Sequence, residues 1–175
     1  MKFSQIIKKM YNANNSDFWL SIIRIVFGIF WILSGLGKVM NPDYVLSFPQ
    51  TIESFMSKNP NKWYIPFLQN FVLPNSSWLA YLISYGELIT GLALVFGLLI
   101  NFFLAYAVFM NINFYFAAGW LSISTAMLNF LMIAIQIILI LSLGSKTLSL
   151  DYLIKLSKMR KSYVKGKLKL FNLFF

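Results

Sequence analysis

Five residues of the first long apolar segment are spaced so that one side of a helix would carry all of them. Arg24, Gly28, Trp31, Gly35 and Lys38 recur every three or four residues, which at about 100° per residue places them on one narrow stripe. The residues between them are mostly Ile, Val, Phe and Leu. A cation is costly in such surroundings, so each one indicates an ion pair or a functional role. Side chains of these types could bind an anion, a carboxylate or an aromatic ring.

A carboxylate occurs in the middle of a second apolar segment, at Glu87. It lies about 11 residues from the expected cytoplasmic end of that segment, which corresponds to a depth of about 16 Å, near the centre of a bilayer. Such a group is either protonated or paired with a cation. Arg24 lies about 9 Å from the same end by the same arithmetic, so we predict an Arg24 to Glu87 pair that fixes helix packing.

Two further apolar segments carry polar stripes. Asn111 is expected to face the centre of a bundle, with Tyr115 one turn further outward, while Asn129 shares a face with Thr125 and Gln136. Two interpretations remain open. The stripes form either a polar, aromatic-walled cavity or a set of interhelical hydrogen bonds that fill the same positions.

The composition places these stripes in a membrane. Hydrophobic residues make up 59% of the 175 residues, charged residues 11%, and the mean hydropathy is +0.70. The chain is therefore an integral membrane protein. Cysteine and histidine are both absent, which argues against disulfides, haem, iron–sulfur clusters and the usual zinc or copper sites.

We predict an all-α, integral membrane four-helix bundle. Its spans are 18–40, 78–98, 100–118 and 125–143, within a transmembrane domain at 18–144. The five prolines fall between residues 42 and 74, so 41–77 is predicted as an ordered extracytoplasmic loop containing short helices at 49–57 and 64–72. Residues 1–17 and 145–175 are predicted as amphipathic segments on the membrane surface.

Charge predicts the orientation. Lys2, Lys8 and Lys9 precede the first span, and eight cations follow the fourth: Lys146, Lys155, Lys158, Arg160, Lys161, Lys165, Lys167 and Lys169. We expect the chain in the plasma membrane. The positive-inside rule then places both termini in the cytoplasm. The apolar residues interleaved with the C-terminal cations favour contact with lipid headgroups over binding of nucleic acid.

Several of these residues also carry a resemblance. The stripe Arg24-x3-Gly28-x2-Trp31-x3-Gly35-x2-Lys38, the element Tyr85-Gly86-Glu87-Leu88-x2-Gly91-Leu92-Ala93-Leu94 and the run Met110-Asn111-x-Asn113-Phe114-Tyr115 resemble the DoxX/DoxD family of membrane proteins. The similarity covers about residues 18–152. Length and the long first loop are most similar to the DoxD branch, the larger subunit of thiosulfate:quinone oxidoreductases.

The resemblance implies an enzyme subunit that oxidises thiosulfate to tetrathionate and passes the electrons to a membrane quinone, held noncovalently and without a metal. It also implies a smaller second subunit. Lys38 would then offset the repulsion between thiosulfate dianions, Glu87 would deliver protons, and Arg24 would orient Glu87 or hold a reduced, anionic quinone. Contacts to the quinone would come from Trp31, Asn111, Tyr115 and Asn129.

A second hypothesis stays open beside the catalytic one. Similar proteins also serve as structural or docking subunits of membrane oxidoreductases, including terminal quinol oxidase complexes, and this chain would then hold partners without reacting itself. A small-solute carrier is less favoured because the four spans show no inverted repeat.

Overall fold

The computed structural model describes residues 15–142, 148–154 and 157. The predicted N-terminal arm and basic C-terminal tail lie almost entirely outside the described residues. Within them the protein is all-helical, and four helices are long and apolar enough to cross a membrane: Asp17–Val39, Ser76–Phe96, Ile100–Leu121 and Ile123–Leu141. The prediction of an all-α protein with four spans is confirmed.

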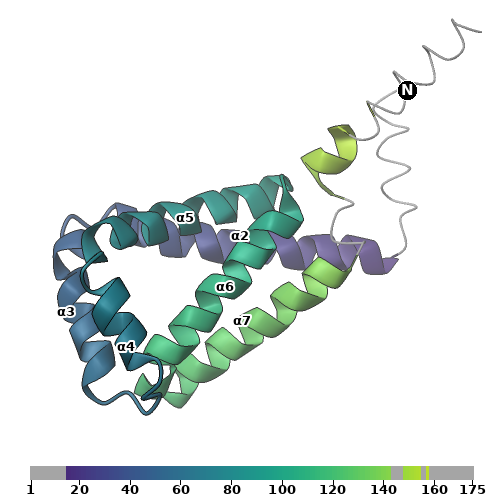
Figure 1. Cartoon of the computed structure of the whole chain (residues 1–175). Coiled ribbons are helices and arrows are strands. Elements are labelled where there is room, and N and C mark those ends of the chain that lie inside the picture. The colour runs from purple at the N-terminus through teal and green to yellow at the C-terminus, as the bar shows by residue number, and fades with distance from the viewer. Residues whose placement is uncertain (1–14, 143–147, 155–156, 158–175) are drawn as a thin grey trace, which may run out of the picture.

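The four helices form two pairs (Figure 1). Helix α2 (Asn15–Val39) packs along α5 (Ser76–Phe96), and α6 (Ile100–Ala118) packs along α7 (Ile123–Leu141). The two pairs meet more closely at one end and diverge toward the other (Figure 1). Each helix therefore packs mainly on its own partner, and the two pairs are separated at the diverging end.

Glycines allow α2 and α5 to approach closely. A Cβ on Gly35 would lie 2.5 Å from the backbone nitrogen of Leu88, and one on Gly91 would lie 2.6 Å from the carbonyl oxygen of Gly28. Small residues at such crossings permit backbone contact that larger side chains prevent. These contacts fix the register of the antiparallel pair, with Gly35 beside Leu88 and Gly28 beside Gly91 and Val95.

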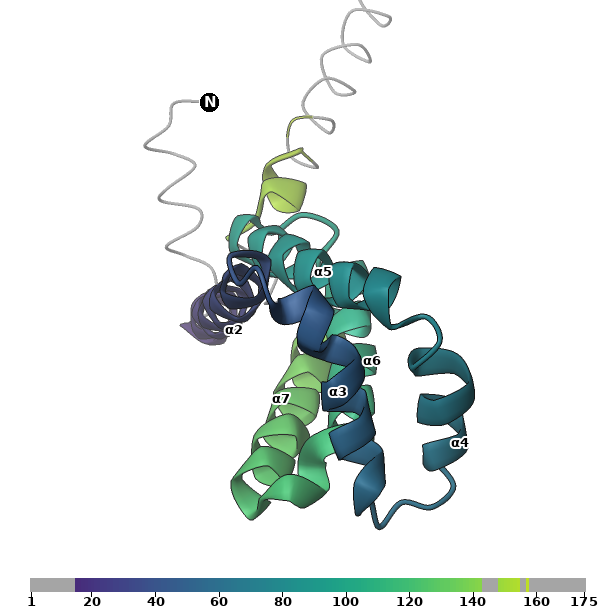
Figure 2. The same ribbon diagram turned by 90° about the vertical axis from the view of Figure 1, so that its left-hand side faces the viewer.

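The segment between the first two spans folds across the wide end of the two pairs (Figure 2). It contains α3 (Tyr44–Ser57), the short α4 (Ile65–Phe67) and the single π-helical stretch η1 (Leu68–Val72). Its own small core joins α3 and η1 to α5 and α6 through Phe48, Ile52, Leu68, Ala80 and Ala117. The predicted ordered loop therefore packs on the bundle.

The prediction for this segment was wrong in one detail. Helix α3 begins at Tyr44, five residues before the predicted start, and carries Pro49 inside it. Proline fits most easily in the first turn of a helix. Deeper in the helix it removes one backbone hydrogen-bond donor. The burial of Phe48 and Ile52 offsets that cost.

Candidate functional site

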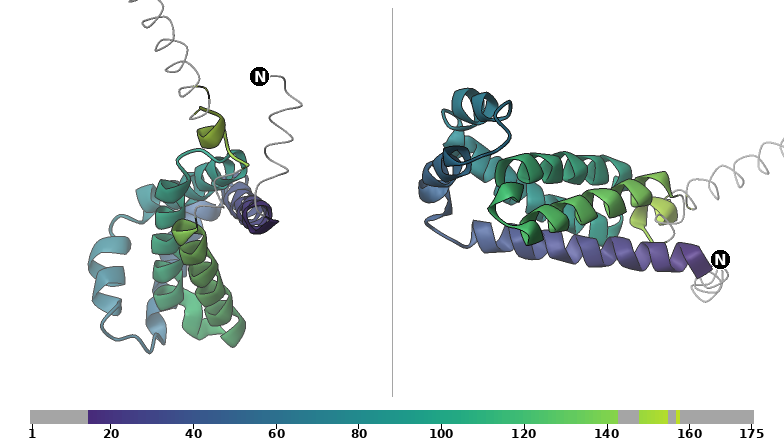
Figure 3. Two further views of the ribbon diagram at one scale, coloured as in Figure 1. Left: turned by 90° about the vertical axis from the view of Figure 1, so that its right-hand side faces the viewer. Right: turned by 90° about the horizontal axis from the view of Figure 1, so that it is seen from below.

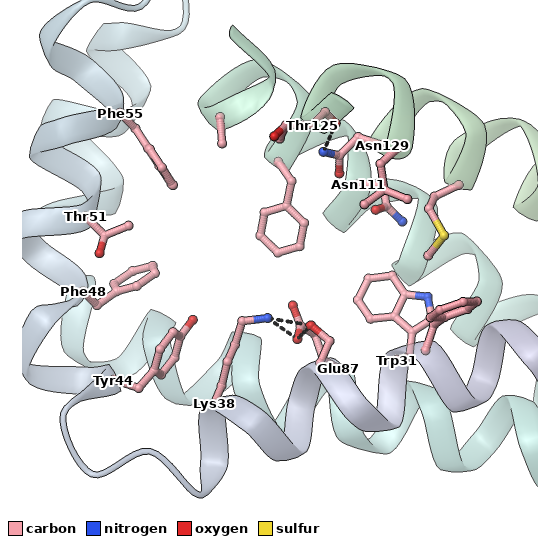
Figure 4. Close-up of a pocket in the computed structure, with 16 residues that line it drawn as sticks. Trp31, Lys38, Tyr44, Phe48, Thr51, Phe55, Glu87, Asn111, Thr125 and Asn129 are labelled. Atoms are coloured by element: carbon pink, nitrogen blue, oxygen red, sulfur yellow. Dashed lines mark hydrogen bonds and ion pairs between the residues drawn. The ribbon is translucent and has the colours of Figure 1, made fainter. Parts of the chain in front are cut away.

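A cavity of about 500 Å³ lies between the diverging helix pairs and α3 (Figure 4). Its walls are mostly apolar and aromatic. The lining residues are Phe30, Trp31, Ser34, Lys38, Tyr44, Phe48, Thr51, Phe55, Glu87, Asn111, Phe114, Ala118, Thr125, Leu128, Asn129 and Met132. Of the two interpretations of the polar stripes, the structure contains the cavity and also some of the interhelical hydrogen bonds.

An ion pair between α2 and α5 lies at the cavity surface. The Lys38 ammonium group contacts the Glu87 carboxylate, and the Ser34 hydroxyl donates to the same oxygen, Oε2, at 2.8 Å. Lys38 also donates to the Ser34 oxygen at 2.9 Å. Glu87 is 1% exposed and the Lys38 side chain 26%. A buried carboxylate needs such partners to remain charged.

Helix α3 supplies one end of the cavity. Tyr44, Phe48, Thr51 and Phe55 recur every three or four residues and point into it (Figure 4). Burial, and secondarily the negative charge of Glu87, raise the pKa of Tyr44 well above its usual value. The phenol therefore stays protonated at physiological pH and is available as a hydrogen-bond donor next to the ion pair.

The opposite wall comes from α6 and α7. Asn111 donates to the Gln136 side chain at 3.2 Å and to its own helix at Ala107, while Asn129 donates to the Thr125 carbonyl at 2.9 Å. Trp31 completes this wall and is 4% exposed. Its indole N–H finds no hydrogen-bond acceptor among the described residues. The six-membered edge of the indole faces the cavity and adds aromatic surface to its wall (Figure 4).

The predicted pair between Arg24 and Glu87 is wrong. Arg24 is fully buried beside the C-terminal end of α5, where it donates to the carbonyl of Leu148 and closely approaches Gly97. Because Arg24 is level with Gly97, it lies about ten residues, or ~15 Å, along α5 from Glu87. The depth arithmetic failed because α2 extends two turns beyond the end of α5, which the sequence does not reveal.

The comparisons with known proteins bear on this arrangement. Residues 19–120 match the family described as DoxX. The chain belongs to the DoxX family. This match confirms the broader resemblance, and the family is one of membrane proteins associated with oxidoreductases. No curated protein and no solved structure matches the chain.

This DoxX protein places most of its predicted site residues around the cavity. Trp31, Lys38, Glu87, Asn111 and Asn129 all line it. Arg24 and Tyr115 do not: Tyr115 is 36% exposed and its ring packs against Phe116. The family match ends before α7, so the cavity wall formed by Asn129 and its neighbours comes from outside the matched region.

Sequence reasoning missed two sets of cavity residues in this DoxX protein. Ser34 lies three residues after Trp31 and four before Lys38, so it shares their stripe and could have been found by spacing. The α3 residues Tyr44, Phe48 and Phe55 also follow helical spacing. These residues reach the cavity because α3 lies across the bundle. That placement depends on tertiary packing, which spacing alone does not predict.

Proposed function

We propose that this protein is the quinone-binding membrane subunit of an oxidoreductase, with thiosulfate as the electron donor. The observation that carries the proposal is the cavity. It combines aromatic and apolar walls, including Trp31, with an ion pair between Lys38 and the covered carboxylate of Glu87. Quinone rings need this combination of apolar surface and a few convergent polar groups.

The residues present fit a quinone ring. The Tyr44 hydroxyl and the Lys38 ammonium would donate to the carbonyls, and the Trp31 ring would contact the quinone ring. Phe48 and Phe114 would cover the ring faces. When bound, a quinone supplies the capacity to accept two electrons and two protons. Glu87, held by Lys38 and Ser34, is the acid–base group closest to that chemistry in the described cavity wall.

Thiosulfate as the donor comes from the resemblance to DoxD. Joining two thiosulfate dianions through a sulfur–sulfur bond gives one tetrathionate dianion and releases two electrons. Lys38 is the cationic side chain among the residues that line the cavity, and Glu87 already neutralises it. Two dianions would therefore repel each other there. We propose that the cavity takes the quinone and that thiosulfate binds at a surface shared with the second subunit.

A second candidate is a non-catalytic docking subunit, for example of a quinol oxidase complex. The specific observation in its favour is that Lys38 and Glu87 join α2 to α5, the pair with the most extensive packing. An ion pair in that place can hold two helices in register without taking part in a reaction.

The test compares Glu87→Gln with the wild-type protein in the purified complex, measuring thiosulfate-dependent quinone reduction. We expect the rate to fall about 100-fold, the usual cost of removing an acid–base group. Glu53→Gln is the matched control, because Glu53 is exposed on α3 and does not line the cavity. An unchanged rate for Glu87→Gln in a correctly assembled complex would leave the docking role as the conclusion.

A further inference from the structure

The cavity is open on the side between α2 and α7. Phe30 of α2 and Leu128 of α7 both line it, yet they are 57% and 61% exposed. Each of the two helices packs mainly on a different partner, α2 on α5 and α7 on α6, so neither covers the other (Figure 3). Both residues belong to membrane-spanning helices. This opening therefore faces the acyl chains of the bilayer.

Polarity increases from this opening inward. Phe30 and Leu128 form an apolar rim. The Ser34 hydroxyl comes next and contacts the ion pair, with Glu87 fully covered behind it. A molecule with a polar ring and an apolar tail would match both zones at once, since its ring reaches the polar groups while its tail stays among apolar side chains and lipid.

We infer that the gap between Phe30 and Leu128 is the lateral opening through which a quinone passes from the bilayer, and that its apolar tail stays between α2 and α7. This inference rests on the proposed function and specifies its ligand class as tailed quinones that partition into the membrane. A tailless quinone gains nothing from the apolar rim. The rim residues thus contribute to specificity, while Trp31 and the ion pair bind the ring.

The absence of cysteine from the sequence makes the opening testable with single cysteines. Leu128→Cys is placed in the full-length protein in nanodiscs and labelled with a bulky maleimide. Binding of a decyl-substituted benzoquinone is followed by quenching of the protein's tryptophan fluorescence. Phe130→Cys, labelled in the same way, is the control, because Phe130 is 65% exposed on α7 but does not line the cavity.

We expect labelled Phe130→Cys to bind the decyl quinone like unlabelled Phe130→Cys, and labelled Leu128→Cys to associate with it about ten times more slowly than unlabelled Leu128→Cys. The same ring without the decyl tail should bind much more weakly to the wild type. Unchanged association after labelling Leu128→Cys, or equal affinity for both quinones, would overturn the lateral opening while leaving the quinone site intact. Failure of the decyl quinone to bind the wild type at all would overturn the proposed function as well.

Discussion

At the scale of single residues, the cavity depends on a carboxylate, Glu87, that has exchanged water for two polar neighbours. Glu87 accepts from Lys38 and Ser34 and is almost fully covered. The aromatic ring of Phe114 lies 5.9 Å from the Lys38 nitrogen and adds a weak attraction. Removal of either charge leaves the other in an apolar cavity, which is the costly outcome for a buried pair.

The first prediction concerns this pair. Lys38→Met should lower the free energy of unfolding by about 2 kcal/mol, because Glu87 stays buried without a cation. The double variant Lys38→Met, Glu87→Gln should recover most of that loss, since no charge remains to be solvated. Thermal unfolding in detergent measures both, and Lys58→Met at the exposed end of α3 is the control. Equal losses in the single and double variants would contradict the role of the ion pair.

The second prediction concerns pH. Burial raises the pKa of Tyr44 above its unfolded value of about 10, so the folded state holds its proton more tightly. The stability that the folded state gains from holding this proton is fully present below pH ~10. It is lost as the pH rises through the raised pKa of Tyr44. Burial raises the pKa of Tyr64 to about 12 as well, so two tyrosines act in the same range.

Tyr44→Phe should therefore reduce the alkaline loss of stability without abolishing it, as measured by thermal unfolding between pH 9 and 11. Tyr44 is suited to this test because its hydroxyl has no hydrogen-bond partner among the described residues, so little else changes. Tyr81→Phe, which removes only the hydroxyl of a side chain exposed on α5, is the matched control. An unaltered alkaline slope in Tyr44→Phe would refute the proposed burial effect.

At the scale of elements, the α2 and α5 pair determines which groups meet. Its glycine contacts bring the helix backbones together and leave no room for a methyl group at Gly35 or Gly91. At the far end of α5, Gly97 adopts a positive φ of 71° that glycine accommodates best. That turn lets the segment at 148–151 pack beside Arg24, with the Asp151 amide donating to the Gly97 carbonyl at 3.1 Å.

The third prediction uses two glycines of one helix. Gly35→Ala should destabilise the protein by about 2 kcal/mol or more, because the added methyl would meet the backbone of Leu88. Gly37→Ala, whose added Cβ would meet nothing within 4 Å, should be neutral or stabilise by up to about 1 kcal/mol through helix propensity. Thermal unfolding of the two variants side by side measures the difference. Similar behaviour of both would show that α2 and α5 do not pack at the register described.

At the scale of the whole molecule, two helix pairs that diverge around a capped cavity make the two ends of the protein different. One end carries α3 and its aromatic core. The other end has the short turn between α5 and α6 and the buried Arg24. The lysine and arginine distribution predicts that the α3 end is extracytoplasmic.

The fourth prediction tests that orientation. In the cysteine-free chain, Lys62→Cys near the α3 end should react with a membrane-impermeant maleimide in intact cells. Asn101→Cys, in the first turn of α6 next to its connection with α5, should react only after the membrane is permeabilised. Both positions are exposed, so access and not burial decides the result. The reverse labelling pattern would place the α3 end in the cytoplasm.

The sequence by itself determined the membrane class, the four spans and the helix faces that carry polar groups. These follow from local properties, because the length and apolarity of a segment decide whether it spans a bilayer and residue spacing decides which side chains share a face. Spacing alone grouped Trp31 with Lys38, and both line the cavity.

Only the tertiary structure decided which cation pairs with Glu87. The choice depends on how far α2 slides along α5, and glycine contacts between distant parts of the chain set that shift. They bring Lys38 to Glu87 and leave Arg24 level with Gly97, where it binds the Leu148 carbonyl instead. The fold of α3 across the cavity is likewise a long-range packing effect, so Tyr44 and Phe48 joined the site only in three dimensions.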